Sequence, residues 1–211
     1  EIFEKDIRRR LKIRNKNTFE TVQKYIINNF AATTSLKSLK KAIEQNGTAI
    51  SEATIARYVK ALLDAKILCE CPRFDMKSKK SLSGEKKYYL ADTAFYFAQN
   101  TDNRINFGPV LENITYIYAK SHDYSVAVGR IGKLECDFIL RNNEMRYSYI
   151  QVAYTIALSK DTEYREYRPL EAIKDNYPKY VVTADSILQQ RNGIEHINLI
   201  DFMGNGKEFL A

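Results

Sequence analysis

Two carboxylates lie two residues apart in an apolar run of the second half of the chain. Glu135 and Asp137 fall within residues 134–140, whose composition predicts a β-strand. Residues i and i+2 of a strand share a face, so the two side chains point in the same direction. Carboxylate oxygens bind Mg²⁺, and a bound Mg²⁺ can promote hydrolysis of a phosphodiester. The alternative is a polar strand edge without catalytic function.

A wider set of residues resembles the centre of restriction-like nucleases of the PD-(D/E)xK type. In those enzymes, acidic residues on adjacent strands and a Glu of the first helix hold Mg²⁺ near the scissile phosphate. The resemblance makes Glu112, Asp137 and Gln151 candidate catalytic residues, and Glu112, Glu135 and Asp137 candidate metal ligands. The lysine that helps to activate water is replaced by Ala153. The resemblance therefore implies a degenerate centre, which needs Mg²⁺ only if it is active and is otherwise the remnant of a lost site.

The second half predicts the elements that would position these side chains. Apolar periodicity indicates a helix after Gly108, strands at 124–128, 134–140 and 147–154, a helix at 161–173, and strands at 179–183 and 194–199. Asp161 is the expected cap of the second helix. An α–β–β–β–α–β order is typical of a mixed sheet with helices packed on it.

The first half predicts three helices and a hairpin. Apolar residues at steps of three and four indicate helices that begin near Thr18, Ser35 and Ser51. A strand at 67–71 closed by Pro72, a basic loop at 73–87 and a returning strand at 88–90 complete the order. This order is typical of a winged helix, whose third helix enters the major groove and whose wing contacts phosphate or the minor groove.

Positive charge is concentrated in this first half. Residues 1–100 contain 20 Lys and Arg against 11 Asp and Glu, whereas residues 101–211 contain 13 against 15. Such an asymmetry favours a polyanionic partner, and we expect double-stranded DNA. The alternative is a winged helix that packs against, or contacts, a partner protein. The predicted nucleic-acid contacts on the third helix and the wing are Arg57, Lys60, Arg73, Lys77, Lys79 and Lys80.

Seven short motifs follow one another in a characteristic order. They are residues 51–58 (SEATIARY), 87–92 (KYYLAD), 111–113 (LEN), 129–130 (GR), 135–138 (ECDF), 150–153 (IQVA) and 165–170 (REYRPL). Together they resemble the C-terminal region of a family of prokaryotic predicted AAA-type ATPases, over nearly the whole chain. In that family, a P-loop ATPase domain precedes a winged helix and a degenerate nuclease-like domain of unknown function. The resemblance therefore implies that ATP binds to an upstream domain.

These observations predict an α+β chain with a winged helix-turn-helix domain followed by a restriction-endonuclease-like α/β domain. Residues 1–16 are expected to be a basic connector from a missing ATPase domain, residues 17–98 the winged helix, and residues 105–211 the nuclease-like domain. The expected function is a non-catalytic module of an AAA-type ATPase that binds DNA or a partner protein. The alternatives are a metal-dependent nuclease with an atypical centre and a regulatory domain that contacts only protein.

Other classes of site find little support. The chain has no G-x-x-x-x-G-K-[ST] loop, so no cofactor is expected in this fragment and ATP belongs upstream. Three cysteines and two histidines lack the usual spacing of zinc ligands, and we expect reduced, structural cysteines in a cytoplasmic protein. No apolar run reaches the roughly 18 residues of a membrane span, so no membrane partner is expected.

Overall fold

The computed structural model describes residues 13, 15–100 and 105–209. Most of the expected connector at residues 1–16 lies outside this range. The described residues form an α+β fold with seven helices and a nine-stranded mixed sheet, in the strand order β1-β3-β2-β4-β5-β6-β7-β9-β8. Contacts divide the chain into unit 1 (Glu1–Cys71 and Gly84–Ile105) and unit 2 (Pro72–Ser83 and Asn106–Ala211).

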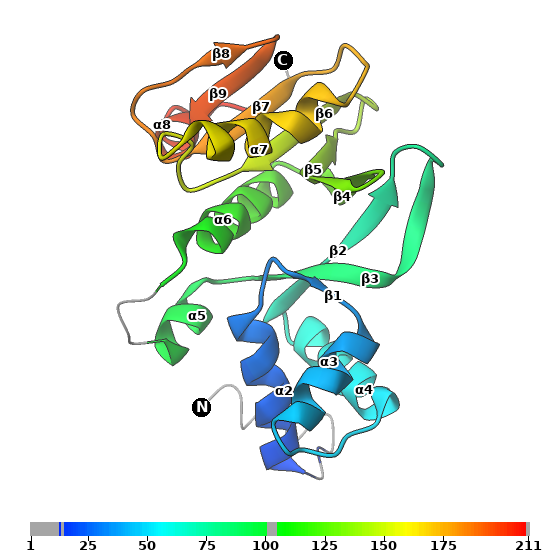
Figure 1. Ribbon diagram of the computed structural model, residues 1–211. Coiled ribbons are helices and arrows are strands. Elements are labelled where there is room, and N and C mark those ends of the chain that lie inside the picture. Colours follow the sequence, from blue (N-terminus) through cyan, green and yellow to red (C-terminus); the bar gives the residue numbers. More distant parts are fainter. Residues whose placement is uncertain (1–12, 14, 101–104, 210–211) are drawn as a thin grey trace. The chain divides into compact units, whose positions relative to one another are not determined.

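Unit 1 contains the three predicted helices of the first half. They are α2 (Lys16–Asn28), α3 (Leu36–Gln45) and α4 (Glu52–Asp64), as Figure 1 shows. Each helix is preceded by a capping residue whose side-chain oxygen accepts a backbone N–H of the first turn. The capping residues are Asn15, Ser35 and Ser51 respectively. The apolar faces of these helices are buried against one another, which explains why their spacing in the sequence was informative. The short elements β1 (Thr33–Thr34) and α5 (Ala94–Gln99) were not predicted.

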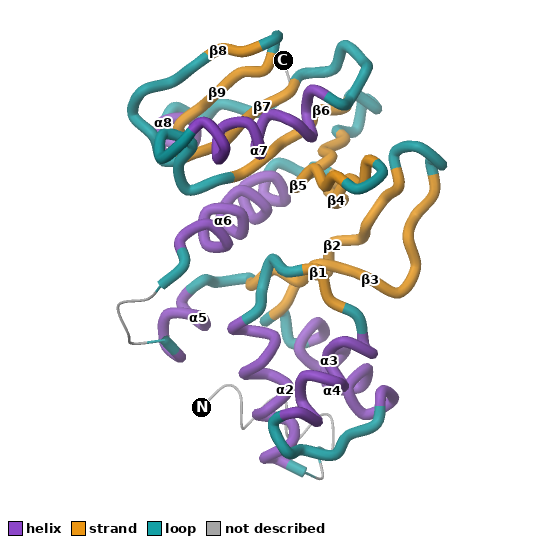
Figure 2. Tube along the Cα trace, viewed as in Figure 1, coloured by secondary structure: helices purple, strands orange, loops and turns teal. Residues whose placement is uncertain are grey.

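The predicted basic loop at 73–87 is wrong. Strand β2 (Leu68–Asp75) continues through Pro72, and β3 (Lys80–Leu90) begins early, so only residues 76–79 form the turn (Figure 2). The extension of β2 has a long-range cause, because Arg73–Asp75 pair in parallel with Val128–Arg130 of β4 (Ser125–Ile131). The base of the hairpin therefore belongs to unit 1 and its tip belongs to unit 2.

Unit 2 follows the predicted α–β–β–β–α–β order. Its elements in chain order are α6 (Phe107–Ser121), β4, β5 (Leu134–Arg141), β6 (Tyr147–Val152), α7 (Lys160–Glu171), β7 (Lys179–Thr183), β8 (Gln190–Arg191), β9 (Ile194–Asn198) and α8 (Leu199–Gly204). Strands β4, β5 and β6 are antiparallel neighbours, whereas β6, β7 and β9 are parallel. Ser159, not Asp161, caps α7, because its hydroxyl accepts the Thr162 N–H. Strand β8 and helix α8 were not predicted.

Helices cover the two faces of the sheet in unit 2. Tyr149 and Ile150 are neighbours in β6 and so point to opposite faces. On the face of Tyr149, the buried residues Tyr167 and Leu170 of α7 pack in one apolar cluster. On the face of Ile150, Tyr116 of α6 lies 6.1 Å from Phe138, the residue paired with Ile150. The middle strands are therefore apolar on both sides, and a polar side chain among them needs a local partner.

Within the described ranges, no helix has both the length and the apolar character that a bilayer crossing requires.

Candidate functional site

Asp137 lies where β5 is irregular. The pairing of β4 with β5 shifts register between Ala127 and Gly129, which places one extra residue in β5 beside Asp137. The side chain is buried, and its Oδ2 accepts the Val152 N–H at 2.9 Å. This hydrogen bond ties the carboxylate to the end of β6. Asp137 therefore has a structural role in addition to any chemical one.

Gln151 is buried beside a carboxylate that the sequence reasoning missed. Its Nε2 donates to Oε2 of Glu166 at 3.1 Å, and Arg165 donates to the other oxygen, Oε1, at 2.9 Å. Gln151 is 9% exposed, and its Oε1 has no hydrogen-bond partner among the described residues. A clue to Glu166 exists in the sequence, because it falls on the apolar stripe that includes Leu170 and Ile173 of the α7 segment.

Ala153 stands where the resemblance to nucleases expects a lysine, and it is part of the apolar core. Ala153 is buried in the cluster that includes Ile156 and Tyr167, and its N–H donates to Val182 O at 3.0 Å. A methyl group at this place supplies neither a positive charge nor a proton. Ala153 therefore cannot act as the water-activating lysine that the resemblance expects at this position.

Glu135 and Arg73, predicted for different functions, form one ion pair within unit 2. Arg73 Nη2 lies 2.7 Å from Glu135 Oε2, with the side chains 10% and 32% exposed. The arginine that was predicted to contact nucleic acid is therefore buried and held by a predicted metal ligand. We leave Arg73 out of any nucleic-acid surface, because a phosphate would have to displace a close carboxylate from a shielded position.

A magnesium centre does not fit these side chains. Glu112 is half-buried on α6, and the described residues contain no group of three or more His, Cys, Asp and Glu side chains arranged to hold a metal ion. Glu135 is neutralised by Arg73, and one oxygen of Asp137 is occupied by a backbone amide. Mg²⁺ requires octahedral oxygen coordination with negative ligands. We therefore derive no step through a metal ion.

The outer face of α4 carries the predicted groove-reading residues. Arg57 is exposed, with its guanidinium 5.5 Å from the centre of the Tyr58 ring. Lys60 is exposed and forms an ion pair with Asp64 at 3.0 Å. Both cations remain accessible, because an exposed ion pair of this kind contributes only about 0.2–1 kcal/mol and is readily exchanged.

The turn between β2 and β3 carries the other predicted cations. Lys77, Lys79 and Lys80 are exposed, and Asp75 closes the turn by accepting the backbone N–H groups of Lys77 and Ser78. The Ser78 amide, with the other donors, lowers the pKa of Asp75. A Cβ atom at Gly132 would lie 3.6 Å from Lys77 Nζ, so this turn adjoins the β4–β5 turn. That second turn adds Arg130 and Lys133, both exposed.

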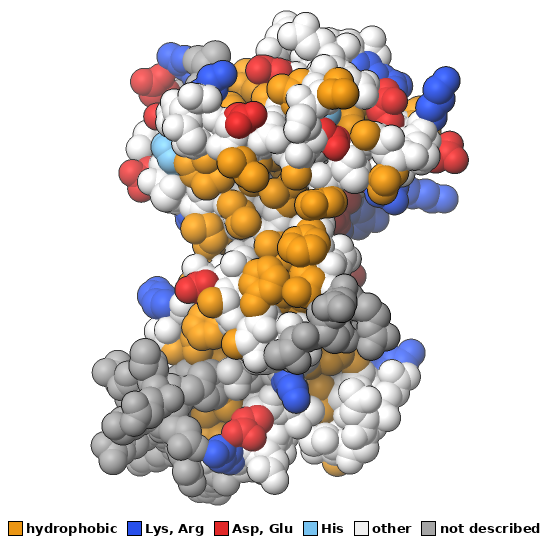
Figure 3. Space-filling view, turned by 90° about the vertical axis from the view of Figure 1, so that its left-hand side faces the viewer, with side chains coloured by type: hydrophobic (Ala, Val, Ile, Leu, Met, Phe, Trp, Pro, Cys, Tyr) orange, Lys and Arg blue, Asp and Glu red, His pale blue; other side chains and the backbone are white. Residues whose placement is uncertain are grey.

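An exposed apolar surface lies at the carboxyl ends of the parallel strands of unit 2. The backbone joins the loops there, since Ala184 N donates to Tyr154 O at 3.0 Å, and the Phe107 and Tyr154 rings are 5.6 Å apart. Figure 3 shows hydrophobic side chains gathered on this face of unit 2. We call this set the carboxyl-edge residues: Phe107, Tyr154, Leu158, Ile187, Leu188 and Ile200. Such a set marks a surface suited to a protein contact.

His196 is buried behind this edge in a fully bonded position. Its Nδ1 accepts the Gln189 N–H at 3.2 Å, so Nε2 carries the proton and donates to Thr183 Oγ1 at 2.7 Å. Burial lowers the pKa of His196 below its ordinary value of 6.5, and the Asp185 carboxylate 3.9 Å away opposes this in part. The three cysteines are thiols, with Cys71 and Cys136 buried.

Comparisons with known proteins find one family model and two relatives. Residues 1–104 match the family model described as "Domain of unknown function (DUF8612)". An uncharacterized protein of Haemophilus influenzae is 27% identical over 199 residues, which is 94% of this chain and 48% of that protein. Uncharacterized protein MJ1544 of Methanocaldococcus jannaschii is 26% identical over 181 residues, which is 82% of this chain and 39% of that protein.

No solved structure matches the chain significantly. The chain spans less than half the length of the two relatives named above, which are themselves uncharacterized. The first half of the chain is thus similar to the DUF8612 family model, and most of the chain is distantly similar to a bacterial and an archaeal protein about twice its length.

Proposed function

We propose that the chain is a non-catalytic module of a longer AAA-type ATPase and that unit 1 binds duplex DNA as a winged helix. The observation that carries this proposal is the division of α4 into two sides. Ile55, Val59 and Leu62 are buried in the three-helix core, whereas Arg57 and Lys60 are exposed on the opposite side. A helix that is anchored in this way by a preceding helix can enter the major groove.

The β2–β3 turn supplies a separate phosphate-binding surface in this proposal. Lys77, Lys79 and Lys80 are mobile, exposed point charges that suit a DNA backbone better than a base edge. Arg130 and Lys133 on the adjoining turn raise the positive potential there. Asp75 at the base of the turn contributes one negative charge, so the five cations remain in excess.

Three positions in the second half of the chain support a module without nuclease activity. The second acidic position is a neutral amide, Gln151, the lysine position is the buried Ala153, and Glu135 is paired with Arg73. The resemblance to AAA-type ATPases assigns ATP hydrolysis to a further domain of a longer protein, and the two relatives are about twice as long as this chain. A cytoplasmic location belongs to the same proposal.

Fluorescence anisotropy of a labelled duplex at low and moderate salt, with Mg²⁺ present, tests DNA binding. We expect salt-sensitive binding that is strongly weakened in the triple variant K77E/K79E/K80E. Loss of three phosphate contacts lowers the slope of log K against log salt by about 2.7. The matched control K160E/K174E/K207E makes the same charge change at exposed lysines elsewhere in unit 2. Equal binding by the two triple variants would rule out the turn as the DNA contact.

A gel of the same samples tests the rival nuclease function. We expect intact DNA with Mg²⁺ and with Mn²⁺. Cleavage that is lost in Asp137→Ala would overturn the assignment of this half as non-catalytic.

A second candidate function is protein binding, which the carboxyl-edge residues favour. Ile187 is 84% exposed and Leu158 is 80% exposed, which is unusual for large apolar side chains in a monomer. In this case the chain would co-purify with a protein but not with nucleic acid. The variant L158E/I187E should lose that protein and keep its fold, because neither side chain is part of the core.

A further inference from the structure

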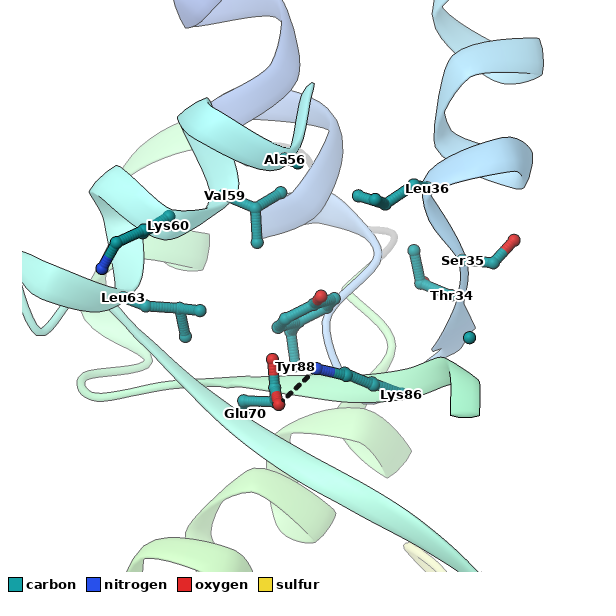
Figure 4. A pocket seen from close by; sticks show the side chains of 11 residues that line it. Thr34, Ser35, Leu36, Ala56, Val59, Lys60, Leu63, Glu70, Lys86 and Tyr88 are labelled. Atoms are coloured by element: carbon teal, nitrogen blue, oxygen red, sulfur yellow. Dashed lines mark hydrogen bonds and ion pairs between the residues drawn. The ribbon is translucent and has the colours of Figure 1, made fainter. Parts of the chain in front are cut away.

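A groove of about 480 Å³ lies within unit 1, on the flank of α4. It is bounded by α4, by the start of α3 and by the β2–β3 hairpin, as Figure 4 shows. Leu36, Val59 and Leu63 make its walls apolar. A volume of this size falls in the range of about 300–1,000 Å³ that is usual for small-molecule sites. The groove lies beside, and does not coincide with, the exposed face of Arg57.

Tyr88 lines the groove and points its hydroxyl group into it (Figure 4). The residue is only 7% exposed, and no described residue of the chain forms a hydrogen bond with that hydroxyl. The hydroxyl groups of Tyr149 and Tyr124 donate to Asp175 and Glu208, whereas the buried hydroxyl of Tyr167 also has no partner among the described residues. A hydroxyl that points into the groove and is bonded to no side chain of the unit is available to a ligand oxygen.

The protonation state of Tyr88 is set by its surroundings. Burial, together with the negative charge of Glu70, raises the pKa of Tyr88 to about 12. The hydroxyl is therefore a hydrogen-bond donor at neutral pH. An acceptor atom of a ligand can therefore meet it.

The charges around the groove favour an anion. Lys86 Nζ lies 2.6 Å from Glu70 Oε1 on the hairpin side, and Lys60 lines the α4 side (Figure 4). Helix α3 begins at the groove with Leu36, so the positive end of its dipole faces the same space. Each lysine has a carboxylate partner, since Lys60 pairs with Asp64 and Lys86 with Glu70. The start of α3 and the Tyr88 hydroxyl then leave the groove with more hydrogen-bond donors than acceptors, which suits an anionic group that joins Lys86.

We propose that this groove binds a small amphipathic anion. Its flat apolar body would lie against Val59 and Leu63, its acidic group would face Lys86 and the first turn of α3, and an acceptor atom would meet the Tyr88 hydroxyl. The groove shares Lys60 with the proposed DNA-binding face of α4, and its ligand binding can be tested without DNA.

Titration of the chain with 8-anilinonaphthalene-1-sulfonate tests the proposal, because this dye combines a flat apolar body with an anionic group. We expect saturable fluorescence enhancement with one dye per chain by calorimetry. Tyr88→Phe removes one hydrogen bond and should weaken binding about three- to tenfold. Tyr25→Phe, at a tyrosine of the same unit that does not line the groove, should leave the affinity unchanged.

Two further measurements make the result specific. Ala56→Phe fills the groove from α4 and should weaken dye binding at least tenfold, with an unchanged far-ultraviolet circular dichroism spectrum. The uncharged analogue N-phenyl-1-naphthylamine should bind more weakly than the sulfonate. Absence of saturable binding, or several bound dyes with equal affinity in all variants, would overturn the proposal and assign the dye to exposed apolar side chains. Equal binding of the uncharged analogue would overturn the choice of an anion.

Discussion

The exchange of Arg73 for Met separates two roles that the sequence and the structure give to this residue. The sequence predicts a contact with nucleic acid, whereas the structure shows an ion pair with Glu135 at 2.7 Å. Met retains the apolar stem of the side chain and removes only the guanidinium group. Because the Arg73 side chain is 10% exposed, the carboxylate left behind is partly shielded from water.

The size of the effect follows from this partial burial. Breaking a fully buried pair costs about 3–5 kcal/mol, and an exposed pair contributes about 0.2–1 kcal/mol. Arg73 is near the first case, and the one-third exposed Glu135 moves the pair towards the second. We therefore expect Arg73→Met to lower the free energy of unfolding by about 2 kcal/mol. Glu135→Gln keeps an acceptor and should cost about 1 kcal/mol, with the double variant less destabilised than the sum.

Urea unfolding followed by far-ultraviolet circular dichroism and tyrosine fluorescence measures these differences, since the chain has no tryptophan. A matched control exists at the β5–β6 turn, where Arg146 pairs with Glu144 at 2.8 Å but both side chains are more than half exposed. Arg146→Met should change the free energy of unfolding by less than about 0.5 kcal/mol.

DNA binding provides the second reading of the same variants. If Arg73 acts only in the fold, the salt dependence of binding is the same in Arg73→Met as in the parent protein. The reasoning is refuted if Arg73→Met is as stable as Arg146→Met and the slope of log K against log salt falls by about one, the value for one lost phosphate contact.

Three further predictions concern the fold. Burial lowers the pKa of His196 in the folded state, so the stabilising contribution of its neutral form is complete above pH 6.5 and decreases as the pH falls below that value. The urea midpoints at pH 7.5 and pH 5 should therefore differ more in the parent protein than in His196→Gln. The control variant His122→Gln should show the same difference as the parent protein. Gly129→Ala places a Cβ 3.1 Å from Ile139 and should cost about 1–3 kcal/mol. Crowding as the cause predicts that the same exchange costs less in the Ile139→Val background than in the parent protein. Ser51→Ala removes the cap of α4 and should cost about 1 kcal/mol by the same assay.

Local patterns in the sequence were sufficient for most elements. The helices that begin after Ser35 and Ser51 follow from apolar spacing and from caps within one turn. The first helix was expected near Thr18 from its apolar spacing, but its cap is Asn15 and it begins at Lys16. These signals act between residues three or four apart, so they are readable without knowledge of the fold. The alternating order of strands and helices in the second half was readable for the same reason. The alanine at position 153, where the resemblance expects a lysine, was also visible in the sequence alone.

Only the tertiary structure decided how distant segments pair. The extension of β2 beyond Pro72 depends on Val128–Arg130, more than 50 positions away along the chain. The same pairing brings Arg73 to Glu135 and removes a predicted nucleic-acid contact. Likewise, Glu166 lies within hydrogen-bond distance of Gln151 because α7 packs on the strand that carries Gln151. Sequence periodicity states which face of an element is apolar, whereas the partner of each polar side chain depends on long-range register that no local signal contains.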